Sequence, residues 1–242
     1  MNPPNTNLRA FQLAVQTLLK SPAQFLPHLT IPTITSLPEQ LGPALQQALH
    51  HENPPNEKDH AITIRALVLD KDNTLCPSKT TTLPPPIYEK LHHLRTSPTS
   101  PFNRDAHPDA ILIVSNRAGS HPRYDAEIAD LEDRLASLRI PVFRLPAGCE
   151  KKPFCGEAVV RWFRERGVVT RADEIAVVGD RLGTDVLMAA RMGSWSVWCR
   201  DGIAEGGDPR RNVLEKMEVW VERYLRESRG LKAPPPAGWN QS

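Results

Sequence analysis

Four consecutive apolar residues, Ala66–Leu69, run directly into carboxylates at Asp70 and Asp72. A short apolar run bounded by polar residues is typical of a strand buried on both faces of a parallel sheet. In open α/β sheets, ligands bind outside the carboxyl ends of the strands. The run therefore predicts a chain folded around a parallel sheet, with both carboxylates where chemistry takes place. At this spacing the first can attack phosphorus and the second can transfer a proton.

Two later apolar runs also end in polar residues. Ile111–Val114 runs into Ser115 and Asn116. Ile175–Val178 runs through one glycine into Asp180. Two carboxylates one residue apart are common in solvated loops, so these strand ends have meaning only as an ordered set.

A lysine before a proline lies between the last two runs. Lys152 directly precedes Pro153, and Asp185 follows shortly after Asp180. This order of motifs resembles the haloacid dehalogenase superfamily of phosphotransferases, and within it the capless subfamily IIIA. The resemblance implies an α/β fold with a doubly wound, Rossmann-like parallel sheet and no large cap domain. The strands ending at Asp70 and Asp180 should be neighbours, because one metal ion must reach both.

The resemblance assigns chemical steps to particular carboxylates. Asp70 is expected to be the nucleophile that forms an aspartyl-phosphate. Asp72 is expected to protonate the leaving oxygen and then to deprotonate water. Mg²⁺ prefers hard oxygen ligands, and the expected ligands are Asp70, Asp180 and the backbone carbonyl of Asp72. Asp185 either binds the metal through water or orients Asp180.

Phosphate binding is expected from the second and third motifs. Ser115 would donate a hydrogen bond to a phosphoryl oxygen, with Asn116 beside it. Lys152 would place a positive charge beside the nucleophile, and it is favoured over Lys151 because the superfamily lysine often lies immediately before proline. A turn-capping role for Ser115 stays open.

Three basic residues next to the motifs have two interpretations each. Lys71 points away from its aspartate neighbours if the loop is extended, so it either contacts the substrate or is simply exposed. Arg117 and Arg181 each follow a motif, and either grip an anionic substrate or belong to the surface.

One branch of the superfamily matches more of the chain. Asp70–Leu75, Val178–Ala189 and Met192–Trp198 are similar to the fungal mitochondrial phosphatidylglycerophosphate phosphatases and their bacterial relatives, and the similarity covers roughly Asn7–Trp198. That family removes the terminal phosphate of phosphatidylglycerophosphate, giving phosphatidylglycerol for cardiolipin synthesis. The resemblance implies an anionic phospholipid substrate at a membrane surface and a peripheral location on the matrix side of the mitochondrial inner membrane.

The motif spacing leaves little room for a cap. The intervals Asp72–Ser115 and Ser115–Lys152 must each hold a helix and a strand, whereas compact domains have about 100 residues or more. A capless site is open to solvent. It suits a substrate that cannot be engulfed, such as a lipid head group in a bilayer, a phosphoprotein or a nucleic-acid end.

Composition fits one α/β core with extensions, because the chain has 242 residues of which 40% are hydrophobic. The net charge of +2 argues against a nucleic-acid binder. The four cysteines show no paired metal spacing, which fits a reducing compartment. No apolar stretch approaches the ~20 residues of a spanning helix, and no pattern indicates an oligomeric state.

If the protein attaches to a membrane, we expect the attachment to be peripheral, and the N-terminal extension, residues 1–60, is the candidate segment. Its apolar residues first recur at helical spacing and then alternate with prolines: Leu8, Phe11, Val15, Leu18 and Leu19, then Phe25, Leu26, Leu29, Ile31, Ile34 and Leu37. The extension either packs on the domain's own sheet or dips into a bilayer interface. A phosphatase domain over 61–230 and a flexible tail over 231–242 are expected to follow.

A helix from about Pro209 to Glu227 is expected near the end of the phosphatase domain. Its amphipathic pattern predicts packing on the core through Val213, Met217, Val221 and Tyr224, with Trp220 at the edge.

The leading function is magnesium-dependent hydrolysis of phosphatidylglycerophosphate. One alternative is a capless phosphoprotein or nucleotide phosphatase. Another, from a different class, is a non-catalytic module that binds RNA or protein. The presence of Asp70, Asp72, Lys152 and Asp180 together argues against pure binding, because binding alone does not need the complete set.

Overall fold

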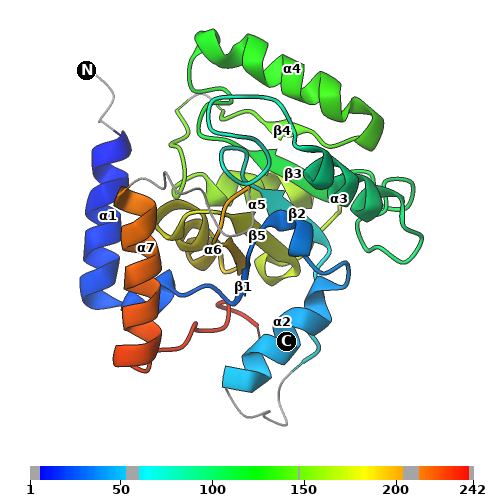
Figure 1. Cartoon of the computed structure of the whole chain (residues 1–242). Helices are drawn as coiled ribbons and strands as arrows, with labels where there is room; N and C mark the ends of the chain where they lie inside the picture. The colour runs from blue at the N-terminus through cyan, green and yellow to red at the C-terminus, as the bar shows by residue number, and fades with distance from the viewer. Residues whose placement is uncertain (1–5, 53–59, 147, 204–212, 240–242) are drawn as a thin grey trace.

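Six parallel strands form one sheet at the centre of the computed structural model, which describes residues 6–52, 60–146, 148–203 and 213–239 (Figure 1). Across the sheet the order is β1–β6–β5–β2–β3–β4, and every neighbouring pair is parallel. The strands are β1 (Leu29–Ile31), β2 (Ala66–Leu69), β3 (Ile111–Val114), β4 (Val142–Phe143), β5 (Ile175–Gly179) and β6 (Trp195–Cys199). The predicted α/β fold with a doubly wound parallel sheet is confirmed.

The direction of strand addition reverses between β2 and β5. From β2 the chain builds outward through β3 and β4, then returns to β5 and builds the other way to β6. Such a switch point opens a crevice outside the carboxyl ends of the two central strands. Leu69 pairs with Val178 across β2 and β5, so the predicted adjacency of the strands ending at Asp70 and Asp180 is confirmed.

Helices cover both faces of the sheet (Figure 1). Helices α2, α3 and α4 pack on one face, and α5 and α6 pack on the other. Helices α1 and α7 contribute to a third hydrophobic cluster, next to β6. The helices are α1 (Thr6–Lys20), α2 (Leu41–Glu52), α3 (Pro85–Thr96), α4 (Asp125–Leu135), α5 (Gly156–Glu165), α6 (Leu187–Met192) and α7 (Val213–Arg223), with the π-helical turns η6 (Leu182–Val186) and η7 (Tyr224–Ser228).

Residues of the central strands alternate between the two faces, because successive side chains of a strand point in opposite directions. In β2, Leu67 and Leu69 pack with α2, α3 and α4, whereas Ala66 and Val68 pack with α5 and α6. Both faces are therefore buried. This is why the strand shows an unbroken apolar run in the sequence instead of an alternating pattern.

The N-terminal extension contributes to the sheet. Its strand β1 pairs with β6, with Leu29 opposite Val197, and Ile34 and Leu37 are buried in the cluster that also holds residues of β2. A boundary at residue 60 thus does not separate two structural units. Residues 1–5 and 53–59 of the extension lie outside the described part of the chain.

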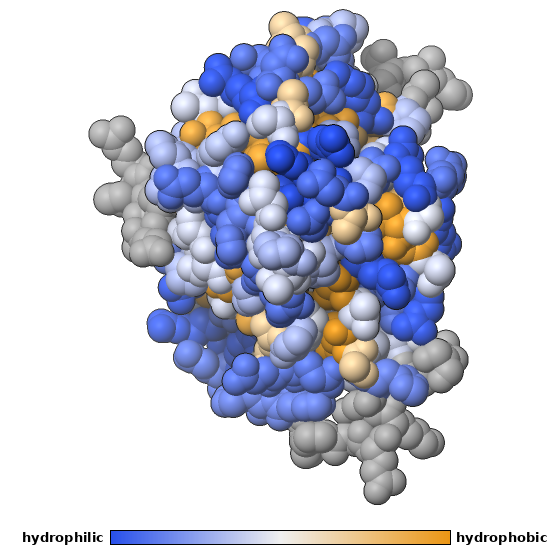
Figure 2. All heavy atoms as spheres, turned by 90° about the vertical axis from the view of Figure 1, so that its right-hand side faces the viewer, coloured by the Kyte–Doolittle hydropathy of each residue, from blue (hydrophilic) through white to orange (hydrophobic). Residues whose placement is uncertain are grey.

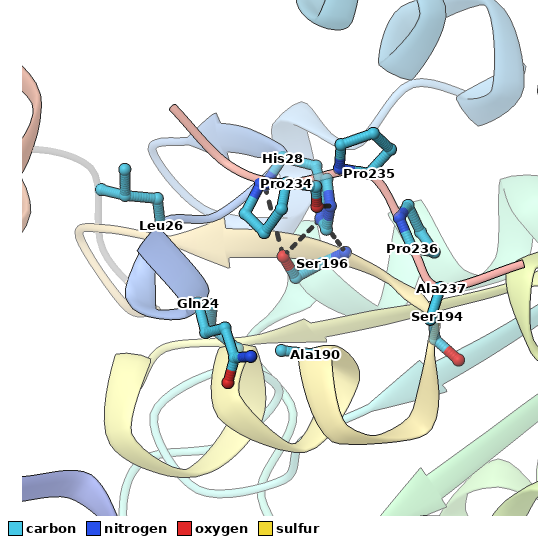
Figure 3. Close-up of a pocket in the computed structure, with 11 residues that line it drawn as sticks. Gln24, Leu26, His28, Ala190, Ser194, Ser196, Pro234, Pro235, Pro236 and Ala237 are labelled. Carbon is cyan, nitrogen blue, oxygen red and sulfur yellow. Dashed lines mark hydrogen bonds between the residues drawn. The ribbon is translucent and has the colours of Figure 1, made fainter. Parts of the chain in front are cut away.

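The described part of the C-terminal tail packs on the sheet, contrary to the expectation of a flexible segment. Trp239 is 6% exposed, and its ring meets that of Trp195 edge-on at a centroid distance of 5.6 Å. Figure 3 shows His28 between Pro234 of the tail and Ser196 of β6, where this segment borders a small pocket. Residues 240–242 are outside the described residues.

A half-buried, neutral histidine holds the tail in place. Burial lowers the pKa of His28 to about 4. The His28 Nε2 lies 2.9 Å from the carbonyl oxygen of Pro234, which can only accept, so Nε2 carries the proton. The Nδ1 atom then accepts a hydrogen bond from the backbone N–H of Ser196 at 3.0 Å.

The residues that α7 buries differ from those predicted. Met217 and Tyr224 are expected to face the core but are 47% and 39% exposed, whereas Glu218 and Leu225 are buried. Val221 packs in the third hydrophobic cluster as predicted, so the buried side includes one predicted position and two that lie one residue further along. The predicted start of this helix at Pro209 lies outside the described residues.

No described helix is both long enough and apolar enough to cross a membrane. Figure 2 shows the side of the molecule that lies away from α1 and α7, and this face is largely hydrophilic with hydrophobic residues in small separate spots. The large hydrophobic side chains that the described residues expose are on α1, α7 and η7 instead.

Replacement of Trp239 by alanine tests the packing of the tail. Removing a buried indole leaves a cavity against Trp195, so Trp239→Ala should lower the free energy of unfolding by about 3 kcal/mol. Equilibrium denaturation in urea measures the change. The control is Trp220→Ala, which removes an indole that is 63% exposed and should change the free energy by less than about 1 kcal/mol. Equal effects of the two substitutions would contradict a packed tail.

Candidate active site

Two buried carboxylates meet at the switch point because β2 and β5 are neighbours. The backbone N–H of Asp70 donates to the carbonyl of Val178 at 2.9 Å, so the ladder between the strands continues to the predicted nucleophile. Asp180 follows β5 directly. Asp70 is 8% exposed and Asp180 is 7% exposed. The structure thus brings the first and last predicted motifs together.

Lys152 connects the two motifs. Its Nζ forms ion pairs with Oδ1 of Asp70 and with Oδ1 of Asp185, the latter at 2.7 Å, and its side chain is only 3% exposed. The backbone N–H of Lys152 donates to Oδ1 of Asn116 at 2.9 Å. Asn116 therefore ties the lysine loop to the end of β3, which is a contact that sequence reasoning did not assign to it.

Burial and mutual repulsion shift the protonation of this cluster. Burial raises the pKa of Asp70 to about 7, although Lys152 acts in the opposite direction. Burial, together with the charges of Asp70 and Asp185, raises the pKa of Asp180 well above its ordinary range. Burial disfavours the charged form of Lys152, but the two carboxylates outweigh it and raise the pKa of its ammonium. The charge of Lys152 is thus insufficient to restore the ordinary pKa of Asp70 or of Asp180.

The cluster fits a magnesium ion. Asp70, Asp180 and Asp185 each offer a carboxylate oxygen, and these atoms lie within 4.8 Å of one another. The Oδ1 atom of Asp180 is buried and has no hydrogen-bond partner among the described residues. An all-oxygen donor set suits Mg²⁺, which would also supply the missing positive charge. Asp185 joins the cluster with its own side chain, and a metal contact by the backbone carbonyl of Asp72 stays a prediction.

The loop after β2 folds back on itself. The carbonyl of Lys71 accepts hydrogen bonds from the N–H groups of Leu75 and Cys76 at 3.0 and 2.9 Å. Asn73 has a φ of 62°, a left-handed conformation that asparagine adopts more readily than most residues. The turn leaves Asp72 on the wall of the pocket above the cluster, where its Oδ1 accepts a hydrogen bond from a backbone N–H at 2.7 Å.

Lys71 is completely buried, so the expectation of an exposed side chain is wrong. That expectation assumes an extended loop, whereas the tight turn folds over the side chain. Its Nζ donates to the carbonyl of Thr80 at 2.7 Å and forms ion pairs with Glu127 at 2.7 Å and Asp72 at 3.2 Å. An ammonium has three hydrogens to donate. These partners use all of them, which argues against a substrate contact.

Ser115 is buried at the end of β3. Its Oγ accepts a hydrogen bond from the backbone N–H of Arg117 at 3.2 Å, which is the turn-capping arrangement that the sequence leaves open. A hydroxyl that accepts one bond can still donate its own proton. The donation to a phosphoryl oxygen stays a prediction.

A pocket of about 250 Å³ lies over the carboxylate cluster. Arg117 and Arg181 both lie on the wall of this pocket. Their position favours the interpretation that they bind an anionic substrate over a simple surface role. Arg117 is held in place by Glu127, whose Oε2 accepts a hydrogen bond at 2.8 Å. The lining consists of Asp70, Asp72, Asn73, Ser78, Asn116, Arg117, Lys152, Asp180, Arg181 and Thr184.

Two glutamates near the site carry no local sequence signal. Glu127 on α4 pairs with both Lys71 and Arg117. Glu218 on α7 is 8% exposed, and its Oε1 accepts a hydrogen bond from the N–H of Gly183 in turn η6 at 3.1 Å. Each reaches the site from a distant helix, so motif spacing could not identify it.

The two intervals that could hold a cap contain only short elements. The described residues between the first and second motifs form α3, β3 and turns, and those between the second and third form α4, β4 and turns. In the described chain, therefore, no inserted domain covers the pocket.

A parallel sheet with paired aspartates after β2, a serine after β3, a lysine before α5 and an acidic pair after β5 defines a phosphatase site of the haloacid dehalogenase type. A family model described as mitochondrial PGP phosphatase, where PGP is phosphatidylglycerophosphate, matches residues 8–204. The chain belongs to this family, and the resemblance drawn from its motifs is confirmed.

Two yeast proteins are similar over most of their length. The chain is 35% identical over 209 residues to the mitochondrial phosphatidylglycerophosphatase GEP4 of Saccharomyces cerevisiae, covering 86% of this chain and 93% of that protein. It is 28% identical over 224 residues to a probable mitochondrial phosphatidylglycerophosphatase of Schizosaccharomyces pombe, covering 90% and 92%. A putative haloacid dehalogenase-like phosphatase from Mesorhizobium loti superposes with a TM-score of 0.41 at 18% identity, over 69% of this chain and 90% of that one.

Replacement of Gly179 by alanine tests the placement of Asp185. A Cβ at this position would lie 2.4 Å from Cγ and Oδ2 of Asp185, so the carboxylate must move away from Lys152. Misplacement of this kind should lower kcat about 100-fold, as measured by phosphate release. The control is Gly183→Ala, whose Cβ would approach nothing closer than Glu218 Oε1 at 3.5 Å. Full activity of Gly179→Ala would contradict a role for the Lys152–Asp185 pair.

Replacement of Glu218 by glutamine tests the buried carboxyl on α7. Burial raises the pKa of Glu218 from 4.5 to about 7. The folded state therefore holds this proton more tightly than the unfolded state, and stability falls as the pH rises from about 4.5 to about 7. Glutamine removes this loss, so the stability of Glu218→Gln relative to wild type should rise by about 2 kcal/mol between about pH 5 and pH 8.

Denaturant titrations at both pH values measure this difference. Glu227→Gln is the matched control, because Glu227 is an exposed glutamate near the same helix. A pH-independent difference between Glu218→Gln and wild type would show that the carboxyl titrates normally.

Proposed function

We propose that this chain hydrolyses phosphatidylglycerophosphate to phosphatidylglycerol and phosphate, with Mg²⁺ as its cofactor. The observation that carries the proposal is the buried cluster in which Lys152 pairs with Asp70 and Asp185 beside Asp180. It provides a nucleophile, a counter-charge and oxygen ligands at one point. Family membership and the names of the yeast relatives support the choice of substrate.

The first step transfers the phosphoryl group to Asp70. A carboxylate oxygen of Asp70 attacks phosphorus in line with the bond to the glycerol oxygen, which breaks. Asp72, on the pocket wall, donates a proton to the departing oxygen. The products of this step are phosphatidylglycerol and an aspartyl-phosphate on Asp70.

The second step releases phosphate. Asp72, now deprotonated, takes a proton from a water molecule, and the water oxygen attacks phosphorus. The bond between phosphorus and the Asp70 oxygen breaks, so the carboxylate is regenerated. The proton from water replaces the one that Asp72 gave to the leaving oxygen, and the site returns to its starting state.

The remaining residues interact with the negative charges of Asp70 and of the phosphoryl group. Lys152 favours the ionised form of Asp70, because its charge opposes the effect of burial on the pKa of that carboxyl, and it lies beside the transferring group. Ser115, Arg117 and Arg181 are suited to phosphoryl oxygens. Asp70, Asp180 and Asp185 would hold Mg²⁺, which would supply positive charge against the phosphoryl oxygens.

Location follows from the substrate and the relatives. The yeast proteins are described as mitochondrial, and the proposed substrate is an anionic lipid that stays in a bilayer. We propose that the enzyme is a peripheral protein on the matrix side of the mitochondrial inner membrane. A pocket without a cap supports this proposal, because it can approach a head group at a bilayer surface.

The proposal is tested by phosphate release from phosphatidylglycerophosphate in mixed micelles, beside a soluble phosphomonoester. With Mg²⁺, the wild type should prefer the lipid. Asp70→Asn should lower kcat on the lipid by about three orders of magnitude or more, because an amide cannot replace the nucleophilic carboxylate. Asp105→Asn is the control, since the side chain of Asp105 is 75% exposed and lies outside the pocket lining.

For each part of the proposal, one outcome of these measurements would refute it. Substantial activity of a folded Asp70→Asn would refute the nucleophile. Turnover that survives chelation by EDTA would refute the metal requirement, whereas loss with EDTA and recovery with Mg²⁺ would support it. Equal turnover of the lipid and the soluble ester would indicate a general phosphatase, and no turnover of either would favour a binding module.

A further inference from the structure

In the described part of the chain, the large exposed hydrophobic side chains lie on α1, α7 and the turn η7. Seven large hydrophobic residues are exposed among the described residues, and all lie on α1, α7 or the turn η7. On α1 they recur at helical spacing, and on α7 and η7 they do so again. They are Leu8, Phe11, Val15 and Leu19, and Met217, Trp220 and Tyr224. We name these seven residues the α1/α7 face.

Helices α1 and α7 lie side by side at one side of the sheet (Figure 1). Their inner faces share one hydrophobic cluster, to which α1 contributes Leu13 and Leu18 and α7 contributes Val219 and Val221. The exposed stripes are therefore additional to the apolar surface that the fold needs for packing. Isolated exposed hydrophobic residues are normal, but a concentration of this kind indicates a contact surface.

The α1/α7 face adjoins the candidate active site. Glu218, one position after Met217, holds the turn η6 through the N–H of Gly183, and η6 contains Asp185. At the other helix, Arg9 of α1 forms an ion pair with Glu150, two residues before Lys152. Both helices are thus attached to loops that form the carboxylate cluster.

We propose that the α1/α7 face lies on the surface of an anionic bilayer, with the pocket beside it. This inference rests on the proposed function, since a lipid substrate requires the enzyme to reach the bilayer. Trp220 and Tyr224 form a stacked pair with ring centroids 5.5 Å apart, and such amphipathic rings favour the membrane interface. Helix α1 has basic residues and no acidic residue, which suits contact with anionic head groups.

The first test measures vesicle binding by the full chain. Vesicles of equimolar phosphatidylcholine and phosphatidylglycerol are sedimented with wild type and with the triple variant Phe11→Ser, Leu19→Ser, Trp220→Ser. The variant should bind at least about tenfold more weakly, because it loses apolar surface that would enter the interface. The control is Gln12→Ser with Gln16→Ser, two exposed polar positions of α1, which should bind as the wild type does.

The second test does not depend on the folding of the triple variant. Trp220 is 63% exposed, whereas the other four tryptophans are buried or half-buried. Brominated phosphatidylcholine in the same vesicles should therefore quench the fluorescence of the wild type and quench that of Trp220→Phe much less. Equal quenching of the two proteins would overturn the proposal.

Failure of this inference is distinguishable from failure of the proposed function. Vesicle binding needs no turnover, so loss of binding in the triple variant supports the surface whatever the substrate. Unchanged binding overturns the surface while lipid hydrolysis in micelles stands. If analytical ultracentrifugation shows a wild-type oligomer that the triple variant dissociates, with vesicle binding unchanged, the face is an interface between copies and the proposal is wrong.

Discussion

The structure depends on the ion pairs of one buried lysine. Three carboxylates, from Asp70, Asp180 and Asp185, are concentrated where little of their surface is exposed, and Lys152 forms ion pairs with two of them, Asp70 and Asp185. Removing either partner of such a pair leaves an uncompensated buried charge, which costs about 3 kcal/mol or more. The adjacency of β2 and β5 and the absence of a side chain at Gly179 both serve this cluster. The chain thus retains an arrangement that is unfavourable for folding alone, as is common at functional sites.

The sequence was sufficient to predict a parallel sheet, its central strands and the polar residues that the structure brings together at their ends, because these follow from local patterns. A strand buried on both faces must be continuously apolar, so Ala66–Leu69 and Ile111–Val114 were recognisable. The ordered polar ends then placed Asp70 and Asp180 together. The prediction of an exposed Lys71 side chain is wrong for an equally local reason. It depends on an extended loop, whereas the chain makes a turn there and buries the ammonium.

Long-range contacts were beyond the sequence. Glu127 and Glu218 reach the site from α4 and α7, and the packing of the tail depends on Trp239 meeting Trp195. Helix α1 illustrates a different limit. It has apolar residues on two sides, such as Leu13 and Leu18 toward the core and others toward solvent, so periodicity alone could not decide which stripe is buried.

Helix α7 contacts the active-site turn on one side and exposes hydrophobic residues on the other. Its residue Glu218 supports the turn that carries Asp185, whereas Trp220 on the same helix points to solvent. A bilayer that binds the outer stripe would therefore restrain the same helix that holds the catalytic turn. If binding to the bilayer restrains α7, it would favour the ion pair between Asp185 and Lys152 at the time when a lipid head group is within reach. An uncapped pocket gains from such coupling, because no inserted domain closes over its substrate.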